Sequence, residues 1–245
     1  MAWLLIDNSN TRTKFALGDE SSLLDWREVT DTTGMDAERL SAIIQGQSFD
    51  AVAIASVVPE KATLLMEFFS KIQTCHLIGH RSPLGFGFDL DHPEQIGNDR
   101  LANVVALSAH HGAPGIAVDF GTAVTFSVLS AAGNFSGGAI APGMDAMTRY
   151  LSDRTAQLPS IAHTEPQTAI GKTTEQALLS GAVYGHRGMV AEIIHRLRDE
   201  IAGEAKVIAT GGGAAFAAAG IPGIDAIDPD LTLEGVRLIA ARVFD

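Results

Sequence analysis

Two stretches of the chain, 112 residues apart, share one pattern, and this internal repeat limits the fold more than any other property. The stretch GIAVDFGTAVTFSVLS begins at Gly115, and shifting it back aligns it with LLIDNSNTRTKFAL near the N-terminus. The aligned pairs are Asp119 with Asp7, Gly121 with Ser9, Thr122 with Asn10, and Thr125 with Thr13. Each copy reads as an apolar strand ending in Asp, a turn of small polar residues, and a second strand. Because similarity at a long period indicates duplicated structural units, the repeat predicts two similar α/β lobes with a cleft between them.

The other apolar patterns assign elements to these two lobes, residues 1–112 and residues 113–245. In the first lobe they predict strands at 3–6, 13–17, 23–29 and 51–58, with Pro59 stopping the last one, and helices near 37–44 and from Asn98 onward. In the second lobe they predict the repeated hairpin, strands at 134–140 and 206–209, and helices near 145–151, 175–201 and 232–244.

Composition excludes several functional classes. The formal net charge is −12 and no run of Lys or Arg occurs, so a nucleic-acid surface is not expected. The single Cys75 excludes an internal disulfide, and its mostly apolar neighbours favour a buried structural thiol over a nucleophile. No apolar run reaches the roughly 18 residues that span a bilayer, and the segment 2–6 lacks the basic region of a signal peptide. We therefore expect a cytoplasmic protein without membrane contact.

The two hairpin tips are the first candidate binding sites. A turn of small polar residues can point consecutive backbone N–H groups outward, which creates a site for phosphate. Arg12 or Lys14 would add positive charge, and Asp7 would hold Mg²⁺ directly or through water. For the first tip alone, we favour the alternative that Asn and Ser only satisfy the backbone of a turn. The second copy at 119–122 favours the phosphate-binding interpretation over the purely structural one, because two such tips on facing lobes can hold a triphosphate between them.

The helix that starts at Asn98 supplies a second kind of candidate. Asp99 has a sufficient structural explanation as a helix cap, and taken alone this explanation is favoured over a catalytic role. Gly97, Asp99 and Arg100 together, however, place a carboxylate and a guanidinium beside free helix amides, which suits an anionic small molecule. The helix dipole would keep Asp99 ionised and weakly basic, which phosphoryl transfer tolerates because the carboxylate mainly orients the attacking hydroxyl.

Glycine-rich turns and a helix start complete the candidates. The turn TGGGAAF at 210–216 would let an adenine or ribose approach the backbone, although such turns are common. The turn GGAIAPG at 137–143 marks a cleft wall. Thr173 or Thr174 is expected to cap the long helix. From the residues alone, a substrate contact by one of them is no more favoured than a purely structural role. The histidines show no metal-ligand spacing with Cys or carboxylates, so we expect no histidine metal site.

Together the motifs resemble those of one known family. IDNSNTRTK, ASVVP, IGNDRLAN, VDFGTAVTF, GGAIAPG, TAQLP, IGKTTEQALLSG and ATGGG follow one another from residue 6 to about 213, in the order seen in type III pantothenate kinases. The resemblance implies the fold of acetate and sugar kinases, Hsp70 and actin, with two ribonuclease-H-like lobes. It implies transfer of the ATP γ-phosphate to the primary hydroxyl of pantothenate, which gives 4'-phosphopantothenate in the first step of coenzyme A biosynthesis. It also implies Mg²⁺, a monovalent cation (K⁺ or NH₄⁺), and a homodimer with pantothenate near the subunit interface.

The same resemblance assigns a role to each candidate residue. Asp99 would be the catalytic proton acceptor, and Arg100 would meet the pantothenate carboxylate. Asp119 would hold the monovalent cation, and Asp7 would lie near Mg²⁺. The residues expected to bind ATP are Asp7, Asn8, Ser9, Asn10, Thr11, Arg12, Thr13, Lys14 and Thr122. The residues expected to bind the substrate are Leu90, Gly97, Asn98, Asp99, Arg100 and Thr174.

The chain departs from the family pattern at three positions. Ser9 stands where the hairpin motif D-x-G-N-[ST] has Gly. If that position needs a positive φ or a close approach of phosphate, Ser9 costs roughly 1 kcal/mol or some affinity. Leu90 stands where the family has a substrate-contacting Tyr, and Thr173 stands where it has Asn. Two alternatives therefore stay open: a non-catalytic accessory relative of the same fold, of the kind that acts in transcription, and a kinase for another small hydroxyl compound.

Overall fold

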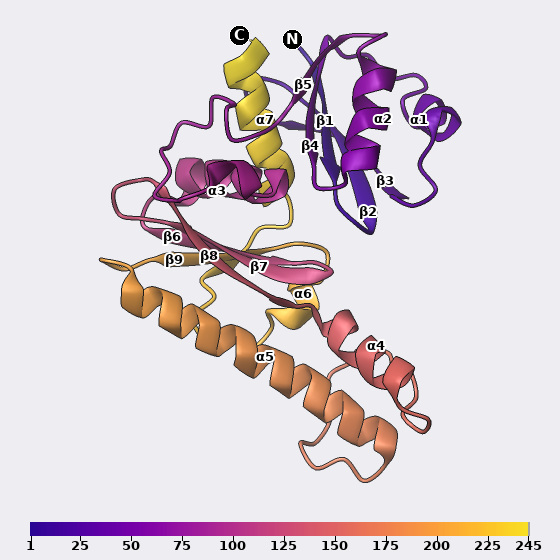
Figure 1. Ribbon diagram of the computed structural model, residues 1–245, viewed down its shortest axis with the longest axis vertical. Coiled ribbons are helices and arrows are strands. Elements are labelled where there is room, and N and C mark those ends of the chain that lie inside the picture. Colours follow the sequence, from indigo (N-terminus) through magenta and orange to yellow (C-terminus); the bar gives the residue numbers. More distant parts are fainter. Residues whose placement is uncertain (245) are drawn as a thin grey trace. The chain divides into compact units, whose positions relative to one another are not determined.

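The computed structural model describes residues 1–244, and they form two compact units (Figure 1). The first unit comprises residues 1–112, residues 133–136 and the C-terminal segment from Asp230, and the second comprises residues 113–132 and 137–229. The predicted lobes, 1–112 and 113–245, differ from these units because the last helix and residues 133–136 group with the first unit. That helix buries Leu231, Val236 and Ile239 there, which explains why it returns to the N-terminal part of the chain.

Each unit contains one five-stranded mixed sheet, and the two sheets share one topology. The first sheet consists of β1 (Trp3–Asn8), β2 (Arg12–Gly18), β3 (Leu23–Asp31), β4 (Ala51–Ser56) and β5 (Thr74–Leu77). The second consists of β6 (Gly115–Phe120), β7 (Ala123–Leu129), β8 (Phe135–Pro142), β9 (Lys206–Thr210) and β10 (Ala226–Ile227). The strand order of the first sheet is β3-β2-β1-β4-β5. The order of the second sheet, started from the edge strand β8 that corresponds to β3, is β8-β7-β6-β9-β10. In both sheets the hairpin strands are antiparallel, and the first strand pairs in parallel with the fourth. The predicted duplication and the fold class of two α/β lobes are confirmed.

Most of the helices lie where the apolar periodicity predicts them. Those of the first unit are α1 (Ala37–Ile43), α2 (Pro59–Phe69), the short 3₁₀ helix η1 (Pro93–Gln95), α3 (Asn98–His111) and α7 (Leu231–Phe244). Those of the second unit are α4 (Met144–Arg154), α5 (Thr174–Glu200) and α6 (Ala214–Ala217). The sequence pattern did not predict α2. Pro59, interpreted as the end of a strand reaching Val58, is instead the first residue of this helix, where the missing N–H of proline costs nothing.

The first sheet is covered on both faces, which explains the continuous apolar runs of β1 and β4. Leu4 and Ile6 join a buried cluster with residues of α1 and α2 on one face. Trp3 and Leu5 point to the opposite face, where α7 packs against β1 and β4 and α3 packs against β4. Asp7 follows the alternation of Trp3 and Leu5, so its carboxylate lies at the end of β1 on the α3 side.

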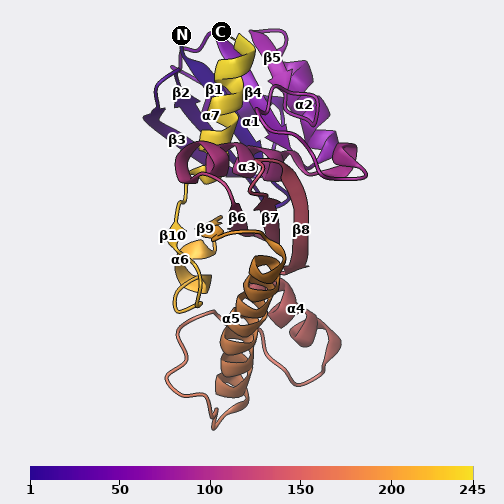
Figure 2. The ribbon, with the colours of Figure 1, turned by 90° about the vertical axis from the view of Figure 1, so that its left-hand side faces the viewer.

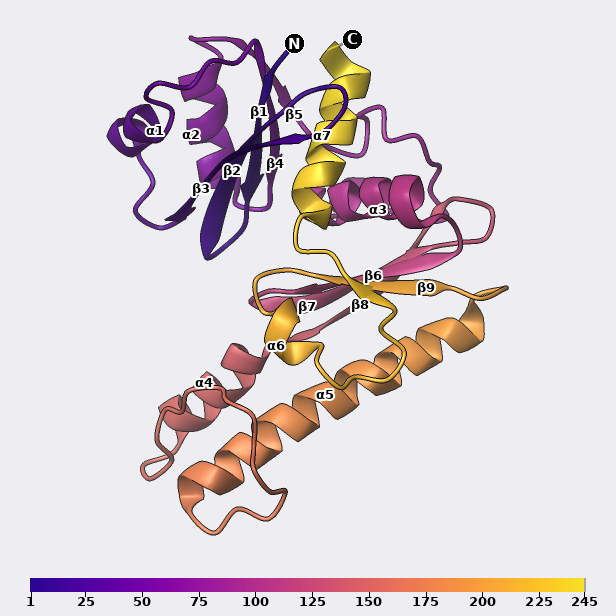
Figure 3. The ribbon, with the colours of Figure 1, turned by 180° about the vertical axis from the view of Figure 1, so that it is seen from behind.

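Helices α3 and α7 cross in close contact on this face (Figure 3). Gly235 of α7 faces the backbone of Ala102 in α3 so closely that any Cβ at this position would overlap the Ala102 carbonyl. Beside this contact, the buried hydroxyl of Thr232 donates to Oδ1 of Asn103 at 2.7 Å. Helix α7 therefore packs directly against the backbone of α3 through Gly235, although the two helices are more than 100 residues apart in sequence.

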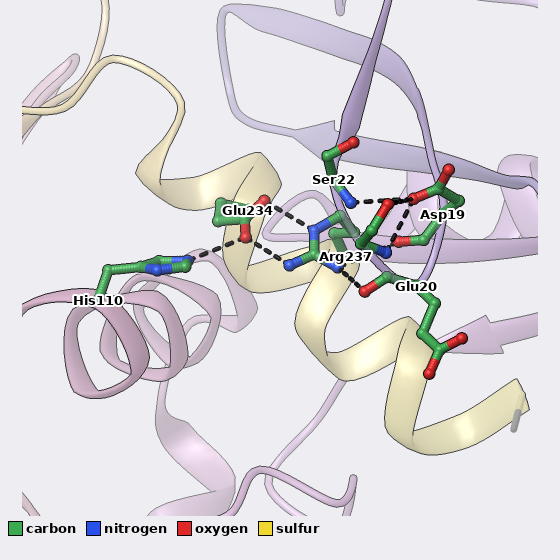
Figure 4. A network of polar contacts seen from close by, with 7 residues as sticks. Asp19, Glu20, Ser22, His110, Glu234 and Arg237 are labelled. Carbon is green, nitrogen blue, oxygen red and sulfur yellow. Dashed lines mark hydrogen bonds and ion pairs between the residues drawn. The ribbon is translucent and has the colours of Figure 1, made fainter.

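A polar network extends the contact from α7 to the far end of the first hairpin. Arg237 is 4% exposed and donates to both carboxylate oxygens of Glu234 and to the backbone carbonyls of Asp19 and Glu20 in the β2–β3 turn (Figure 4). His110, near the end of α3, donates through Nε2 to Glu234 at 2.9 Å. Burial alone would raise the pKa of Glu234, but the hydrogen bonds and charge of Arg237, with a smaller contribution from His110, lower it overall.

The second unit has a helical layer on one face of its sheet. Val183, Val190 and Ile194 of α5 pack in one buried cluster with the alternate apolar residues of β6 and β7. Helix α4 lies beside the N-terminal half of α5 (Figures 1 and 2). Across residues 1–244, none of the helices has the length and apolar character that a membrane crossing requires.

Candidate functional site

The tip of the β1–β2 hairpin contains an ion pair between a buried carboxylate and a partly exposed ammonium group. Asp7 and Lys14 lie opposite each other in the strand register, and Nζ of Lys14 is 3.1 Å from Oδ2 of Asp7. The Asp7 side chain is 3% exposed, whereas that of Lys14 is 28% exposed. A cation that reaches solvent at a strand end beside a buried carboxylate suits an anionic ligand that approaches from outside.

Ser9 does not occupy a strained position in this tip. Within residues 1–244 only glycines have a positive φ, so Ser9 needs none of the conformational freedom of Gly. Its hydroxyl donates to Oδ1 of Asp7 at 3.3 Å, and its backbone N–H donates to the carbonyl of Arg12 at 3.0 Å. The conformational cost considered for Ser9 is therefore absent, and one of the backbone N–H groups expected to face outward is used inside the turn.

The predicted ATP-binding residues of the tip fall into two groups. Asn10, Thr11 and Arg12 are exposed at the turn. Asn8 and Thr13 are buried, and Nδ2 of Asn8 donates to Oγ1 of Thr13 at 2.7 Å. The exposed group is placed to meet a ligand, and the buried pair is placed to shape the turn from below.

The predicted substrate residues at the start of α3 form a compact set. Gly97 precedes the helix, and a Cβ there would lie 2.6 Å from Oδ1 of Asp99, so the Asp99 carboxylate occupies the space that a side chain at position 97 would take. The same oxygen accepts the backbone N–H of Arg100 at 2.8 Å. Asn98 reaches back from the first helical residue and donates through Nδ2 to the backbone carbonyl of Ser56 at 2.9 Å. Asp99 is not the N-cap, because Gly97 occupies that position and no side chain caps it. The Asp99 carboxylate is instead held in the first turn of the helix by the backbone N–H of Arg100.

Arg100 lies in a partly apolar environment next to this carboxylate. Its guanidinium carbon is 5.5 Å from the centre of the Phe135 ring, a cation–π distance. Burial lowers the pKa of Arg100, and the charge of Asp99 opposes that shift. Arginine stays protonated in proteins, so a charge that has lost part of its hydration would gain from a bound carboxylate. Leu90, the residue at the Tyr position of the family, is half-buried one residue after Asp89, whose carboxylate accepts from Asn134 at 3.1 Å.

The β6–β7 hairpin of the second unit carries Asp119 and Thr122 and is shaped by glycines. Thr122 is exposed at the tip, and its carbonyl accepts the N–H of Gly143 at 3.1 Å. A Cβ on Gly143 would lie 2.5 Å from the carbonyl of Gly121, so only glycine allows this approach. Gly211 has a φ of +94° and packs against Asp119 and the backbone of Phe120. The motifs GGAIAPG and ATGGG therefore both pack on this tip.

The register of this hairpin corrects the gapless alignment of the repeat. Asp119 lies opposite Thr125, whereas Asp7 lies opposite Lys14. The connection between β6 and β7 is one residue shorter than that between β1 and β2, because β1 and β2 enclose three residues and β6 and β7 enclose two. Thr125 is thus the counterpart of Lys14 rather than of Thr13.

Thr174 lies at the start of α5 and lines a groove of about 810 Å³ between α4 and α5. Thr173 is the N-cap, since its hydroxyl accepts the N–H of Gln176 at 3.2 Å, so of the two threonines it is Thr173 that caps the helix. The groove is lined mainly by apolar side chains, among them Met147, Tyr150, Leu151 and Leu178.

Sequence reasoning did not single out three residues that shape these sites. Ser56 contacts the first hairpin and α3, and Gly143 and Gly211 contact the second hairpin. The signals were present in the motifs ASVVP, GGAIAPG and ATGGG, but a motif does not tell which segment its residues touch.

Comparison with known proteins identifies the family. Residues 3–196 match the family model described as type III pantothenate kinase. A type III pantothenate kinase of Akkermansia muciniphila is 48% identical over 240 residues, which cover 98% of each chain, and one of Methylacidiphilum infernorum is 40% identical, covering 96% of this chain and 87% of the relative.

Solved structures show the same fold at lower identity. A Campylobacter jejuni protein described as a Baf family transcriptional activator has a TM-score of 0.62 at 21% identity, with 98% of each chain covered. A Sinorhizobium meliloti protein described as a 2-dehydro-3-deoxygalactonokinase has a TM-score of 0.61 at 13% identity, covering 99% of this chain and 97% of the other. The two-unit fold, the ordered motifs and the full-length similarity agree: this chain belongs to the type III pantothenate kinase family.

Proposed function

We propose that this protein transfers the γ-phosphoryl group of ATP to the primary hydroxyl of pantothenate. The observation that carries the proposal is the family match over most of the chain, joined to an oriented carboxylate, Asp99, at the start of α3. Phosphoryl transfer depends chiefly on positioning and charge stabilisation, and a weakly basic carboxylate is sufficient to orient the attacking hydroxyl. Asp99 would accept the hydroxyl proton, and Arg100 would pair with the pantothenate carboxylate.

The first hairpin would hold the phosphates of ATP. Its exposed turn residues and the Lys14 ammonium supply donors and positive charge, which an overall acidic protein must provide locally. Asp7 fits a role beside Mg²⁺, because each carboxylate oxygen keeps a second lone pair after contact with Lys14 or Ser9. Bound Mg²⁺ would supply neutralisation of phosphate charge.

The second hairpin would contact ATP through Thr122 and a monovalent cation, K⁺ or NH₄⁺, through Asp119. The type of ligand atoms supports the cation role. Asp119 provides a carboxylate near the end of β6, and the backbone carbonyl oxygens of Gly121 and Thr122 lie close to Gly143 in the same unit. Oxygen ligands of this kind suit hard cations. Restoring activity to cation-free protein with K⁺ or NH₄⁺, and its loss in Asp119→Ala, would test this role.

A second copy of this chain would cover the groove between α4 and α5. Tyr150 is 64% exposed and Leu151 39% exposed on its rim, and exposed apolar surface of this kind marks interaction sites. Thr174 in the groove would then place substrate near the subunit interface. Sedimentation analysis tests this, since Tyr150→Glu should shift a dimer toward monomer.

We place the activity in the cytoplasm. Cys75 is unpaired, and burial raises the pKa of its thiol to about 11, so it stays protonated and unreactive at neutral pH. A thiol of this kind is compatible with a reducing compartment.

The decisive experiment measures ADP release by the purified protein with Mg²⁺, K⁺ and millimolar ATP, with and without pantothenate. Asp99→Asn should keep the fold and reduce the pantothenate-dependent rate at least about a hundredfold, the range of general-base losses. Asp25→Asn, an exposed carboxylate on β3, is the matched control and should leave the rate unchanged. Growth rescue of a strain without its own pantothenate kinase separates this substrate from another hydroxyl compound. Release of no ADP in any condition would favour a non-catalytic relative.

A further inference from the structure

A chain of buried side-chain hydrogen bonds runs beneath the first hairpin, and the backbone carbonyl of Ser56 extends it to the start of α3. Its five members come from β1, β2, the segment after β3, β4 and α3. Asn8, Thr13 and Asn98 are among the residues expected to bind ATP or substrate, whereas Thr32 and Ser56 are not. The chain consists of Thr32, Thr13, Asn8, Ser56 and Asn98.

Ser56 stands at the centre of this chain. It is the last residue of β4, lies directly opposite Asn8 in the parallel register with β1, and is 7% exposed. Its hydroxyl donates to Oδ1 of Asn8 at 2.6 Å and accepts the N–H of Val58 at 3.2 Å. The backbone N–H of Val57 also donates to the Asn8 carbonyl at 3.1 Å, so β4 holds Asn8 through both side chain and backbone.

From Asn8 the chain continues to the tip of the hairpin. Nδ2 of Asn8 donates to Oγ1 of Thr13 at 2.7 Å, and Thr13 and Thr32 share a hydrogen bond of 2.9 Å between their hydroxyls. Thr32 donates to the backbone carbonyl of Ser9 at 2.7 Å. Because a hydroxyl has one hydrogen and Thr32 gives its own to Ser9, Thr13 must be the donor to Thr32. Each hydroxyl in this part of the chain therefore both donates and accepts.

In the other direction the chain reaches the proposed substrate site. The backbone carbonyl of Ser56 accepts Nδ2 of Asn98 at 2.9 Å, and Asn98 immediately precedes Asp99. Gly97 packs beside the same turn, since a Cβ there would lie 3.4 Å from Cγ1 of Val57. The end of β4 thus contacts the hairpin that would bind phosphate and the helix start that would bind pantothenate.

We propose that Ser56 is a positioning residue that keeps the first hairpin and the Asp99 end of α3 in one fixed arrangement. The inference rests on the proposed function, because its consequence for catalysis requires that both segments act in the same reaction. A fully satisfied buried network is rigid, and phosphoryl transfer loses rate when its reacting groups are misplaced by a fraction of an ångström. Ser56 would therefore affect the rate of the chemical step without contacting either substrate.

The test compares Ser56→Ala with Thr232→Val. Both changes remove one buried hydroxyl that donates to an Asn Oδ1, at 2.6 Å and 2.7 Å respectively, and both hydroxyls lie in segments that contact α3. Only Ser56 also touches the hairpin. We expect Ser56→Ala to lower kcat about tenfold while the KM values for ATP and pantothenate change less than about threefold, as misplacement of bound groups predicts. Thr232→Val should keep kcat within about twofold of the unmodified protein, at a similar loss of stability.

Two further measurements keep the inference open to refutation. Ser56→Cys keeps a donor group at the γ position, although a larger and weaker one, so it should give an intermediate kcat if Ser56→Ala folds poorly. Amide hydrogen exchange of the ligand-free full chain should be faster in 8–13 in the Ser56 variants. It should stay unchanged in 97–101, because these variants keep the Ser56 backbone carbonyl that accepts from Asn98, and it should not be faster in 8–13 in Thr232→Val.

An unchanged kcat in the Ser56 variants, or an equal loss in Thr232→Val, overturns the inference. An unmodified protein with no pantothenate-dependent ADP release refutes the proposed function instead. In that case the exchange measurement still decides whether the Ser56 hydroxyl holds the hairpin against the end of β4, since unchanged exchange in 8–13 overturns that role.

Discussion

The two hairpin tips descend from one pattern, yet they are stabilised in different ways. In the first, side chains define the tip: Lys14 pairs with Asp7, and Ser9 donates to the same carboxylate. In the second, backbone contacts define it: Gly143 and Gly211 lie against the tip at positions where no side chain fits. A side-chain network can be altered gradually by substitution, whereas close backbone contact tolerates almost none. The second tip should therefore be the more sensitive of the two to small changes.

The largest effect is expected at Gly211. Its φ of +94° disfavours any L side chain, and a Cβ would meet the backbone N and O of Phe120, both at 2.8 Å. Left-handed strain of about 1–2 kcal/mol and overpacking of about 1–3 kcal/mol together predict that Gly211→Ala lowers the free energy of unfolding by about 2–5 kcal/mol. Urea denaturation measures this change.

Gly212 provides the matched control for this substitution. It is the next residue, its φ is not positive, and a Cβ added there would meet no atom within 4 Å beyond its chain neighbours. Gly212→Ala should change the free energy of unfolding by less than about 0.5 kcal/mol. Equal losses in the two variants would show that the glycine contacts do not define the second tip.

The second effect in size is expected at Lys14. Lys14→Met leaves the Asp7 carboxylate, 3% exposed, without its cation at 3.1 Å. Complete burial of an unpaired charge costs about 3–5 kcal/mol, but Lys14 is 28% exposed and solvent screens the loss, so we expect about 1–3 kcal/mol. Thermal and urea unfolding measure it.

Thr125 is the counterpart of Lys14 in the second hairpin, and it sharpens the comparison. Thr125→Val is close in shape and removes no charge opposite Asp119, so we expect a loss below about 1 kcal/mol. A larger loss at Thr125 than at Lys14 would contradict the view that side chains support the first tip more than the second.

The sequence predicted the duplication and most of the elements because strands, helices and the repeat all leave periodic apolar patterns, but it did not predict β5, β10 or α2. The prediction was wrong at Pro59, because a proline can either end a strand or begin a helix. The sequence pattern indicated Pro59 as the end of a strand, and in the structure it is the first residue of α2. It also failed at the one-residue difference between the tips, because turn length is set by the register of Asp119 with Thr125, which no local pattern records. Ser56 could not be recognised for a related reason. Its partners Asn8 and Asn98 are 48 and 42 residues away and become neighbours only in the folded unit.

The third effect is expected at Ser9. Since Ser9 is unstrained and donates to Asp7, Ser9→Gly should destabilise the protein by about 1 kcal/mol, through a lost hydrogen bond and the greater flexibility of unfolded glycine. Asn10→Gly at the exposed tip is the control and should show only the flexibility cost, about 0.5–1 kcal/mol. A Ser9→Gly protein that is more stable than the original would mean that Ser9 strains the turn after all.

The smallest effect is expected at the opposite end of the first hairpin, where the α7 network holds the β2–β3 turn. Burial tends to raise the pKa of Glu234, but the hydrogen bonds and charge of Arg237, with a smaller contribution from His110, lower it below its ordinary value in the folded protein. A carboxyl group with a lowered folded pKa adds stability above its unfolded pKa of about 4.3, and this stability is lost as the pH falls through the folded pKa. Glu234→Gln should therefore be less stable than the unmodified protein at pH 7, by about 1 kcal/mol or less after solvent screening, and the difference should shrink below about pH 4. Urea unfolding at a series of pH values measures this difference. A gap between the two proteins that stays constant from pH 7 to pH 3 would contradict a contribution from the ionised Glu234 carboxylate.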